Sequence, residues 1–250
     1  MQIERIMIGD IPAKLFRADR PQLTVLALHG FGGSKDSWAI QGLAERLCGK
    51  GCNILAFDWP CHGERNEACS ELTVERCIED LLSVERFAES EYGGRTSVFA
   101  TSFGGFVLLN RMERHPHAFE RIVLRVPAVN MAAALFNSAK LQAADLSLDK
   151  AKTEGFDLVV GKRFCLPFEF YEQLDRLSAV RYSSRWNSSD MLTVWAERDE
   201  LVPPEDTREF LRLNPLIQPL CISGSGHRMA ERPEYLAAAL DAAAAFIEKA

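Results

Sequence analysis

Short apolar runs alternate along the chain with segments of helical periodicity, and this alternation restricts the fold more than any other feature. Residues 23–28 and 52–57 are apolar almost throughout, as expected for strands that are buried on both faces. Between them, residues 38–48 place apolar side chains at helical spacing. Repeated strand–helix units of this kind predict an α/β fold with a mostly parallel sheet and helices on both faces.

The alternation continues through most of the chain but stops in its third quarter. With two strands near the N-terminus, we expect about eight strands, the later ones at residues 96–100, 121–126, 191–195 and 216–222. Helical periodicity followed by an irregular aromatic stretch occupies the gap after the sixth strand. We interpret residues 130–188 as a helical cap subdomain, inserted over the carboxyl edge of the sheet within a single domain that spans residues 1–250.

Composition and charge argue against several classes of protein. The net charge is −6 with no basic stripe, which disfavours nucleic acid and anionic membranes as partners. No segment approaches the roughly 18 continuous apolar residues of a membrane span, and the N-terminus lacks the apolar stretch of a signal peptide. We therefore expect a cytoplasmic protein that acts on a small molecule, while its oligomeric state stays unknown.

The seven cysteines are an odd number without a C-x-x-C pair, which favours reduced thiols over disulfides. Cys61 with His62, or Cys48 with Cys52, could be considered as zinc ligands, but neither pair has the spacing of a zinc finger or ribbon. The sequence therefore predicts neither a metal nor a cofactor.

Ser102 lies where an apolar run ends in a turn of small residues that leads into a helix. Such a sharp turn projects the serine Oγ above the sheet, and the residues two before and two after must be small. These are Ala100 and Gly104, so the pattern A-x-S-x-G differs by one methyl group from the usual G-x-S-x-G. The turn alone is also compatible with an ordinary loop between a strand and a helix.

Two further loops that follow predicted strands supply an acid and a base. Asp199 and His227 come after the last two strands, and the carboxyl ends of parallel strands share one edge. An imidazole can take the proton of a serine hydroxyl, and a carboxylate can fix the tautomer of that imidazole. We therefore predict Ser102, Asp199 and His227 as catalytic residues, with Glu197 and Glu200 as alternatives to Asp199.

A glycine-rich loop at residues 29–34 follows an early strand. Acyl transfer places negative charge on the carbonyl oxygen, which requires two backbone N–H donors. We expect these donors at Phe31 and at Phe103, directly after the serine. Neither G-x-G-x-x-G nor the lysine spacing of a P-loop is present, which disfavours phosphate binding, although the loop could be only a flexible turn.

Together these loops resemble the α/β-hydrolase family over about residues 23–248. The resemblance rests on His29-Gly30-Phe31-Gly32-Gly33-Ser34, Asp58-Trp59-Pro60-Cys61-His62-Gly63, the Ser102 turn, Asp199 with Pro203, and Gly226-His227. It implies the α/β-hydrolase fold, with these loops as oxyanion loop, structural loop, nucleophile, acid and base. By the same resemblance Asp58 and His62 are structural, and some lipase-like relatives share the A-x-S-x-G turn.

The expected activity is that of a serine hydrolase, a carboxylesterase for small or medium substrates that are apolar or aryl, acting through an acyl-enzyme on Ser102. Thioester or amide hydrolysis on the same residues remains an alternative, as does a catalytically silent homologue that binds a small ligand. Aromatic residues of the cap are candidates for the substrate pocket or for the core of the cap itself: Phe136, Phe164, Phe168 and Trp186.

Overall fold

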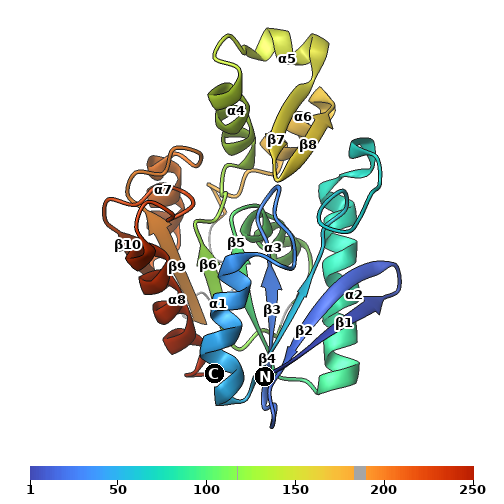
Figure 1. Cartoon of the computed structure of the whole chain (residues 1–250). Helices are drawn as coiled ribbons and strands as arrows, with labels where there is room; N and C mark the ends of the chain where they lie inside the picture. Colours follow the sequence, from blue (N-terminus) through green and yellow to red (C-terminus); the bar gives the residue numbers. More distant parts are fainter. Residues whose placement is uncertain (117, 183–189) are drawn as a thin grey trace.

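The computed structural model describes residues 1–116, 118–182 and 190–250. Eight strands form one sheet in the order β1-β2-β4-β3-β5-β6-β9-β10 (Figure 1). Their bounds are β1 Gln2–Ile8, β2 Ile11–Arg17, β3 Leu23–Leu28, β4 Cys52–Phe57, β5 Thr96–Thr101, β6 Ile122–Arg125, β9 Met191–Ala196 and β10 Gln218–Ile222. The helices around this sheet are α1 Trp38–Leu47, α2 Val74–Tyr92, α3 Phe103–Arg114, α7 Pro204–Leu213 and α8 Pro233–Ile247, with short 3-10 turns at Cys48–Lys50 and Cys69–Glu71.

The sheet is parallel from β4 to β10, and only β1 and β2 run against their neighbours. Strand β3 pairs in parallel with β4 and β5, and β6 pairs in parallel with β5 and β9. Strand β2 pairs antiparallel with both β1 and β4. This confirms the mostly parallel sheet of eight strands and places the carboxyl ends of β3, β5, β6, β9 and β10 on one edge.

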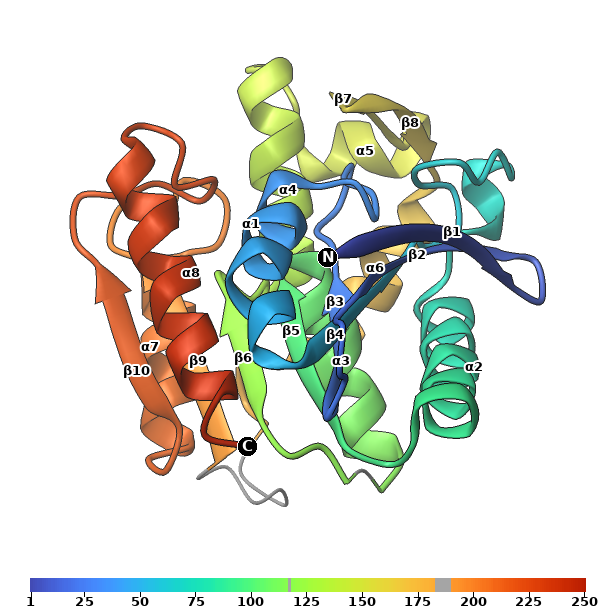
Figure 2. The same ribbon diagram turned by 60° about the horizontal axis from the view of Figure 1, so that its bottom comes forward.

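Two apolar cores, one on each face of the sheet, explain why the central strands have continuous apolar sequences. Val25 and Ala27 of β3 pack into the core that contains α1 and α8. The alternate residues Leu26 and Leu28 pack into the core that contains α2 and α3. Figure 2 shows α1 and α8 on one side of the sheet and α2 and α3 on the other.

The chain between β6 and β9 forms an insert above the carboxyl edge of the sheet (Figure 1). The described part of this insert contains α4 Met131–Gln142, α5 Leu148–Glu154, the antiparallel strands β7 Phe156–Val160 and β8 Lys162–Leu166, and α6 Phe168–Arg176. The position after the sixth strand is as expected. The insert contains the expected helices, but the aromatic stretch, expected to be irregular, forms a hairpin at residues 156–166.

Burial alternates along both strands of this hairpin. Phe156 and Leu158 are buried in β7 while Asp157 and Val159 are exposed, and a similar alternation holds in β8. Gly161 connects the strands with φ +72°, a backbone conformation that favours glycine. The hairpin is therefore stabilised by one buried face and a turn that suits glycine.

Candidate active site

Ser102 lies at the junction between β5 and α3 with φ +50° and ψ −112°, a conformation rarely adopted by residues other than glycine. Its backbone is held from three directions. Its N–H donates to the carbonyl oxygen of Arg125 at 3.0 Å, and its carbonyl oxygen accepts from the N–H groups of Phe106 and Ala128, each at 3.1 Å. Strain of about 1–3 kcal/mol at such a residue persists only where the surrounding structure enforces it.

The backbone of α3 passes very close to the end of β3 beside this turn. A Cβ added at Gly104 would lie 2.8 Å from the Cβ of Leu28 and 2.9 Å from the carbonyl oxygen of His29. A Cβ at Gly30 would lie 3.2 Å from the Cβ of Ser102. The glycine at position 104 therefore satisfies the requirement for a small residue after the serine, and it brings the loop at residues 29–34 next to Ser102.

Ser102, His227 and Asp199 come together as the sequence predicted. The Oγ of Ser102 lies 2.9 Å from Nε2 of His227, and Nδ1 of His227 lies 2.8 Å from Oδ2 of Asp199. The other carboxylate oxygen of Asp199 accepts backbone N–H groups from Leu201 at 3.0 Å and Val202 at 2.8 Å. These bonds fix the carboxylate, so that it can hold the imidazole with Nδ1 protonated and Nε2 free to accept a proton.

The two alternative acids bond elsewhere. Glu200 accepts the backbone N–H of His227 at 2.9 Å. Glu197 accepts the hydroxyl of Ser223 at 2.8 Å and the N–H of Gly224 at 2.7 Å. Both carboxylates thus stabilise the loop that carries His227, while Asp199 bonds to the ring itself.

The backbone N–H groups of Phe31 and Phe103, the two donors expected from the sequence, lie on segments that pack against each other. Phe103 is the first residue of α3, where N–H groups have no acceptor within the helix. Neither N–H donates a hydrogen bond to any of the residues that the structure describes. The rings of Phe31 and Phe103 meet edge to face with centroids 5.9 Å apart, which packs the two segments together.

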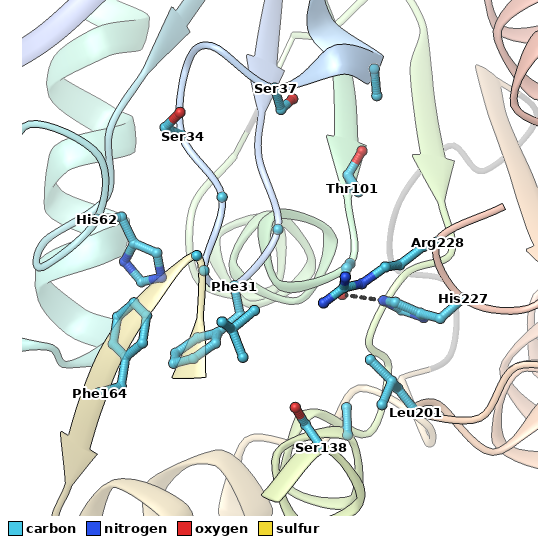
Figure 3. A pocket seen from close by; sticks show the side chains of 18 of the residues that line it. Phe31, Ser34, Ser37, His62, Thr101, Ser138, Phe164, Leu201, His227 and Arg228 are labelled. Carbon is cyan, nitrogen blue, oxygen red and sulfur yellow. Dashed lines mark hydrogen bonds between the residues drawn. The ribbon is translucent and has the colours of Figure 1, made fainter. Parts of the chain in front are cut away.

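A cavity of about 790 Å³ opens between the insert and the carboxyl edge of the sheet, and both Ser102 and His227 line it. Figure 3 shows the hydroxyl-bearing residues Ser34, Ser37 and Thr101 on one side of this cavity. Apolar residues, among them Phe31, Phe164 and Leu201, lie on the other side (Figure 3). The Ser138 hydroxyl lies beside Leu201, so the cavity offers a mainly apolar side and a more polar side to a ligand.

The four aromatic residues expected at the pocket have different positions. Phe164 lines the cavity, with its ring centroid 4.6 Å from that of Phe31. Phe136 does not line it, because α4 presents Met131, Ala134, Leu135 and Ser138 to the cavity, at helical spacing that leaves residue 136 off this face. Phe168 stacks on Phe156 and Tyr171 within the insert, and Trp186 lies outside the described residues.

His29 and His62 are buried beside the site and are neutral. Burial lowers the pKa of His29 to about 4 and that of His62 to about 3. Each ring donates from Nδ1 to a backbone carbonyl oxygen at 2.8 Å, that of Gly30 and that of Pro60 respectively. Neither histidine hydrogen-bonds to the Ser102 hydroxyl, so both differ from His227 in their role.

Asp58 forms a buried ion pair that organises the neighbouring loop. Its carboxylate accepts the Lys35 ammonium at 2.6 Å and the backbone N–H groups of Lys35 at 2.8 Å and Glu64 at 2.9 Å. A Cβ at Gly63 would lie 2.2 Å from this carboxylate, and Gly63 has φ +54°. These contacts fit the structural role that the family resemblance implies for Asp58.

The described residues contain no group of three or more His, Cys, Asp or Glu side chains that could hold a metal ion. The Cys61 thiol donates to the carbonyl oxygen of Ala68 at 2.9 Å, and burial raises its pKa to about 11. All seven cysteines are free. Within the same described ranges, no helix is both long and apolar enough to cross a membrane.

Two arginines that line the cavity were not singled out from the sequence. Arg125 ends β6 and donates from Nη2 to the carbonyl oxygen of Arg228 at 2.9 Å. Arg228 follows His227 directly, and this adjacency was the signal in the sequence that could have identified it.

The fold, the sharp turn at Ser102 and the hydrogen bonds of His227 define the chain as an α/β hydrolase in structural class. The sequence profile of the Alpha/beta hydrolase family matches residues 25–239. The chain therefore belongs to this family. A comparison with the sequences of curated proteins gave no match.

Solved structures share the fold along the whole chain. Est1E from Butyrivibrio proteoclasticus, solved with ferulic acid, is 18% identical with a TM-score of 0.72, covering 98% of this chain and 96% of its own. A monoacylglycerol lipase from Paleococcus ferrophilus is 21% identical with a TM-score of 0.67, covering 100% and 99%. An esterase from Pyrococcus furiosus is 18% identical with a TM-score of 0.64, covering 99% and 92%. At these identities the similarity establishes the fold.

Proposed function

We propose that the protein is a serine hydrolase that cleaves carboxylic esters of small or medium size. The observation that carries this proposal is the continuous hydrogen-bonded chain from the Ser102 hydroxyl through His227 to Asp199. A hydroxyl so placed can lose its proton to the imidazole as it attacks a carbonyl carbon. Membership of a hydrolase family and the esterase and lipase among its structural neighbours support the same activity.

The reaction proceeds in two halves. Ser102 Oγ bonds to the carbonyl carbon of the ester while His227 takes the hydroxyl proton, and the N–H groups of Phe31 and Phe103 stabilise the negative charge on the carbonyl oxygen. The C–O bond to the alcohol then breaks, and His227 returns its proton to the leaving alcohol. Water, deprotonated by His227, next attacks the acyl-enzyme and releases the acid and the free Ser102 hydroxyl.

The apolar side of the cavity provides a place for an acyl or aryl group. Phe31, Leu135, Leu158 and Phe164 line it, and burial of such surfaces contributes about 25 cal/mol per Å² of apolar area. This side therefore favours substrates whose acyl group is apolar and of small or medium length.

A panel of p-nitrophenyl esters, together with thioesters and aminoacyl amides, tests the proposal on the purified protein. We expect turnover of esters by the wild type, and a loss in Ser102→Ala that leaves only about 10³- to 10⁴-fold acceleration over water. Ser138→Ala is the matched control, because Ser138 lines the same cavity but no histidine of the described residues bonds to it. Undiminished turnover in Ser102→Ala would remove the proposal, whereas turnover of thioesters or amides alone would change the substrate class.

A further inference from the structure

Arg228 places an unpaired positive charge in the cavity that contains Ser102. The residue is exposed, lines the cavity and follows His227 directly in the chain. Among the described residues no carboxylate forms an ion pair with its guanidinium. In Figure 3 the Arg228 side chain points into the same part of the cavity as the His227 ring.

The other charged residues of the cavity are already bound within the protein. Arg125 is 6% exposed and lies in the field of the Asp199 carboxylate, and Lys162 donates its ammonium to the carbonyl oxygen of Arg65 at 3.1 Å. The acidic residue that lines the cavity, Asp36, holds the ammonium of Lys14 at 2.6 Å. Arg228 is therefore the exposed charge of the cavity, whereas Arg125, whose Nε has no partner among the described residues, is buried.

The local charge of the cavity is opposite in sign to that of the whole chain. The protein carries a net charge of −6, whereas three basic residues and one acidic residue line the cavity. A positive cavity in an acidic protein attracts anions to one place. A guanidinium also presents a planar fork of N–H donors that matches both oxygens of a carboxylate.

We infer that the substrate is an ester that also carries a carboxylate, and that Arg228 is the specificity-determining residue that binds this carboxylate beside Ser102. The inference rests on the proposed function, since it assigns a substrate class to the same site. The more polar side of the cavity, where Ser34 and Ser37 lie, accommodates the hydrophilic end of such a molecule.

Matched pairs of esters test the inference. In one pair, monomethyl glutarate places the carboxylate on the acyl side, and methyl pentanoate is its neutral counterpart. In the other, carboxymethyl pentanoate places it on the alcohol side, and propyl pentanoate is neutral. The quantity measured is the ratio of kcat/KM for the charged ester to that for its neutral counterpart, in each variant.

We expect one pair to show a ratio of about 10 to 100 in the wild type, the range expected of a hydrogen bond to a charged group. The ratio should fall toward 1 in Arg228→Ala, fall below 1 in Arg228→Glu, and be partly retained in Arg228→Lys. High salt should lower the wild-type ratio, because exposed charges are screened. Arg20→Ala removes the same charge from an exposed residue that does not line the cavity, and should leave the ratio unchanged.

Circular dichroism and thermal unfolding verify that each variant is folded. If Arg228→Ala does not fold, the ratio measured in Arg228→Lys still tests the inference. Two outcomes overturn the inference while the hydrolase function stands. One is that the wild type cleaves the charged and the neutral ester of both pairs equally well. The other is that the kcat/KM ratio is unchanged in a folded Arg228→Ala. If the wild type cleaves none of the four esters nor any in the p-nitrophenyl panel, the proposed function itself fails, and this inference fails with it.

Discussion

The backbones of Gly32 and Gly161 meet where the insert contacts the glycine-rich loop of the core. A Cβ added at Gly161 would lie 2.4 Å from the carbonyl oxygen of Gly32, and a Cβ at Gly32 would lie 2.3 Å from the side chain of Val160. Both glycines have positive φ, +73° and +72° respectively. The hairpin turn therefore packs directly against the loop that carries the Phe31 N–H.

This contact predicts that the hairpin turn positions the Phe31 donor. Gly161→Ala should lower kcat about tenfold or more, because a Cβ there must displace the loop at Gly32. Gly155→Ala is a matched control, since Gly155 also has φ +73° and its Cβ would lie 2.5 Å from the carbonyl oxygen of Leu166, inside the insert. Steady-state kinetics and thermal unfolding of both variants separate the effects. Equal losses of kcat in the two variants would count against a role for this contact.

The orientation of the imidazole predicts the effect of changing the acid. Asp199→Asn should lower kcat roughly 10⁴-fold with the fold intact, because an amide no longer favours the tautomer with Nδ1 protonated. Glu197→Gln should retain activity, since Glu197 bonds to Ser223 and Gly224 instead of the ring. Ester kinetics on both variants and on Glu200→Gln check this. If only the glutamate variants lost ester turnover, the catalytic acid would be one of these glutamates instead of Asp199.

The close approach of α3 and β3 predicts a loss of stability at Gly104. Gly104→Ala should lower the free energy of unfolding by about 1–3 kcal/mol, because the new Cβ would lie 2.8 Å from Leu28. Gly94→Ala should change it little, since no atom lies within 4 Å of the added Cβ. Urea denaturation measures both. An equally stable Gly104→Ala variant would show that strand and helix can separate there at no cost.

The buried histidines predict that stability falls with acidity. Because burial lowers the pKa of His62 to about 3, the unfolded chain binds its proton more readily below the ordinary value of 6.5. The stability that neutral His62 contributes is thus fully present above pH 6.5 and decreases as pH falls, by about 2 kcal/mol at pH 5.

Urea denaturation between pH 5 and 7 checks this dependence. His62→Gln should show a weaker decrease of unfolding free energy toward pH 5 than the wild type does. The exposed His115 is the control position, and His115→Gln should follow the wild-type curve. Identical pH dependence in all three proteins would contradict the account of His62.

Local sequence was sufficient to predict the central strands and to bring three of the candidate site residues to one edge of the sheet. Residues 23–28 and 52–57 form strands at their predicted limits, because short continuous apolar runs are typical of strands that are covered on both faces. Ser102, Asp199 and His227 meet because the carboxyl ends of parallel strands share one edge. Periodicity and chain order thus place the three loops together, whereas the hydrogen bonds of the folded chain distinguish Asp199 from Glu197 and Glu200.

Features that depend on contacts between distant segments were harder to predict. In the hairpin at residues 156–166, apolar residues alternate with polar ones on both sides of Gly161, which is the pattern of two strands. The many aromatic residues in this stretch made the alternation hard to recognise in the sequence. The position of Phe136 away from the cavity depends on how α4 is rotated against the sheet, which its own sequence does not determine. The unpaired state of Arg228 likewise depends on which distant carboxylates approach it.

Mapping the adduct of a fluorophosphonate probe tests the central claim most directly. The purified protein is incubated with the probe at pH 7, digested and analysed by mass spectrometry. The account predicts one adduct, on the peptide that contains Ser102, and none in Ser102→Ala. An adduct on another serine such as Ser138, or ester turnover without any adduct at Ser102, would contradict it.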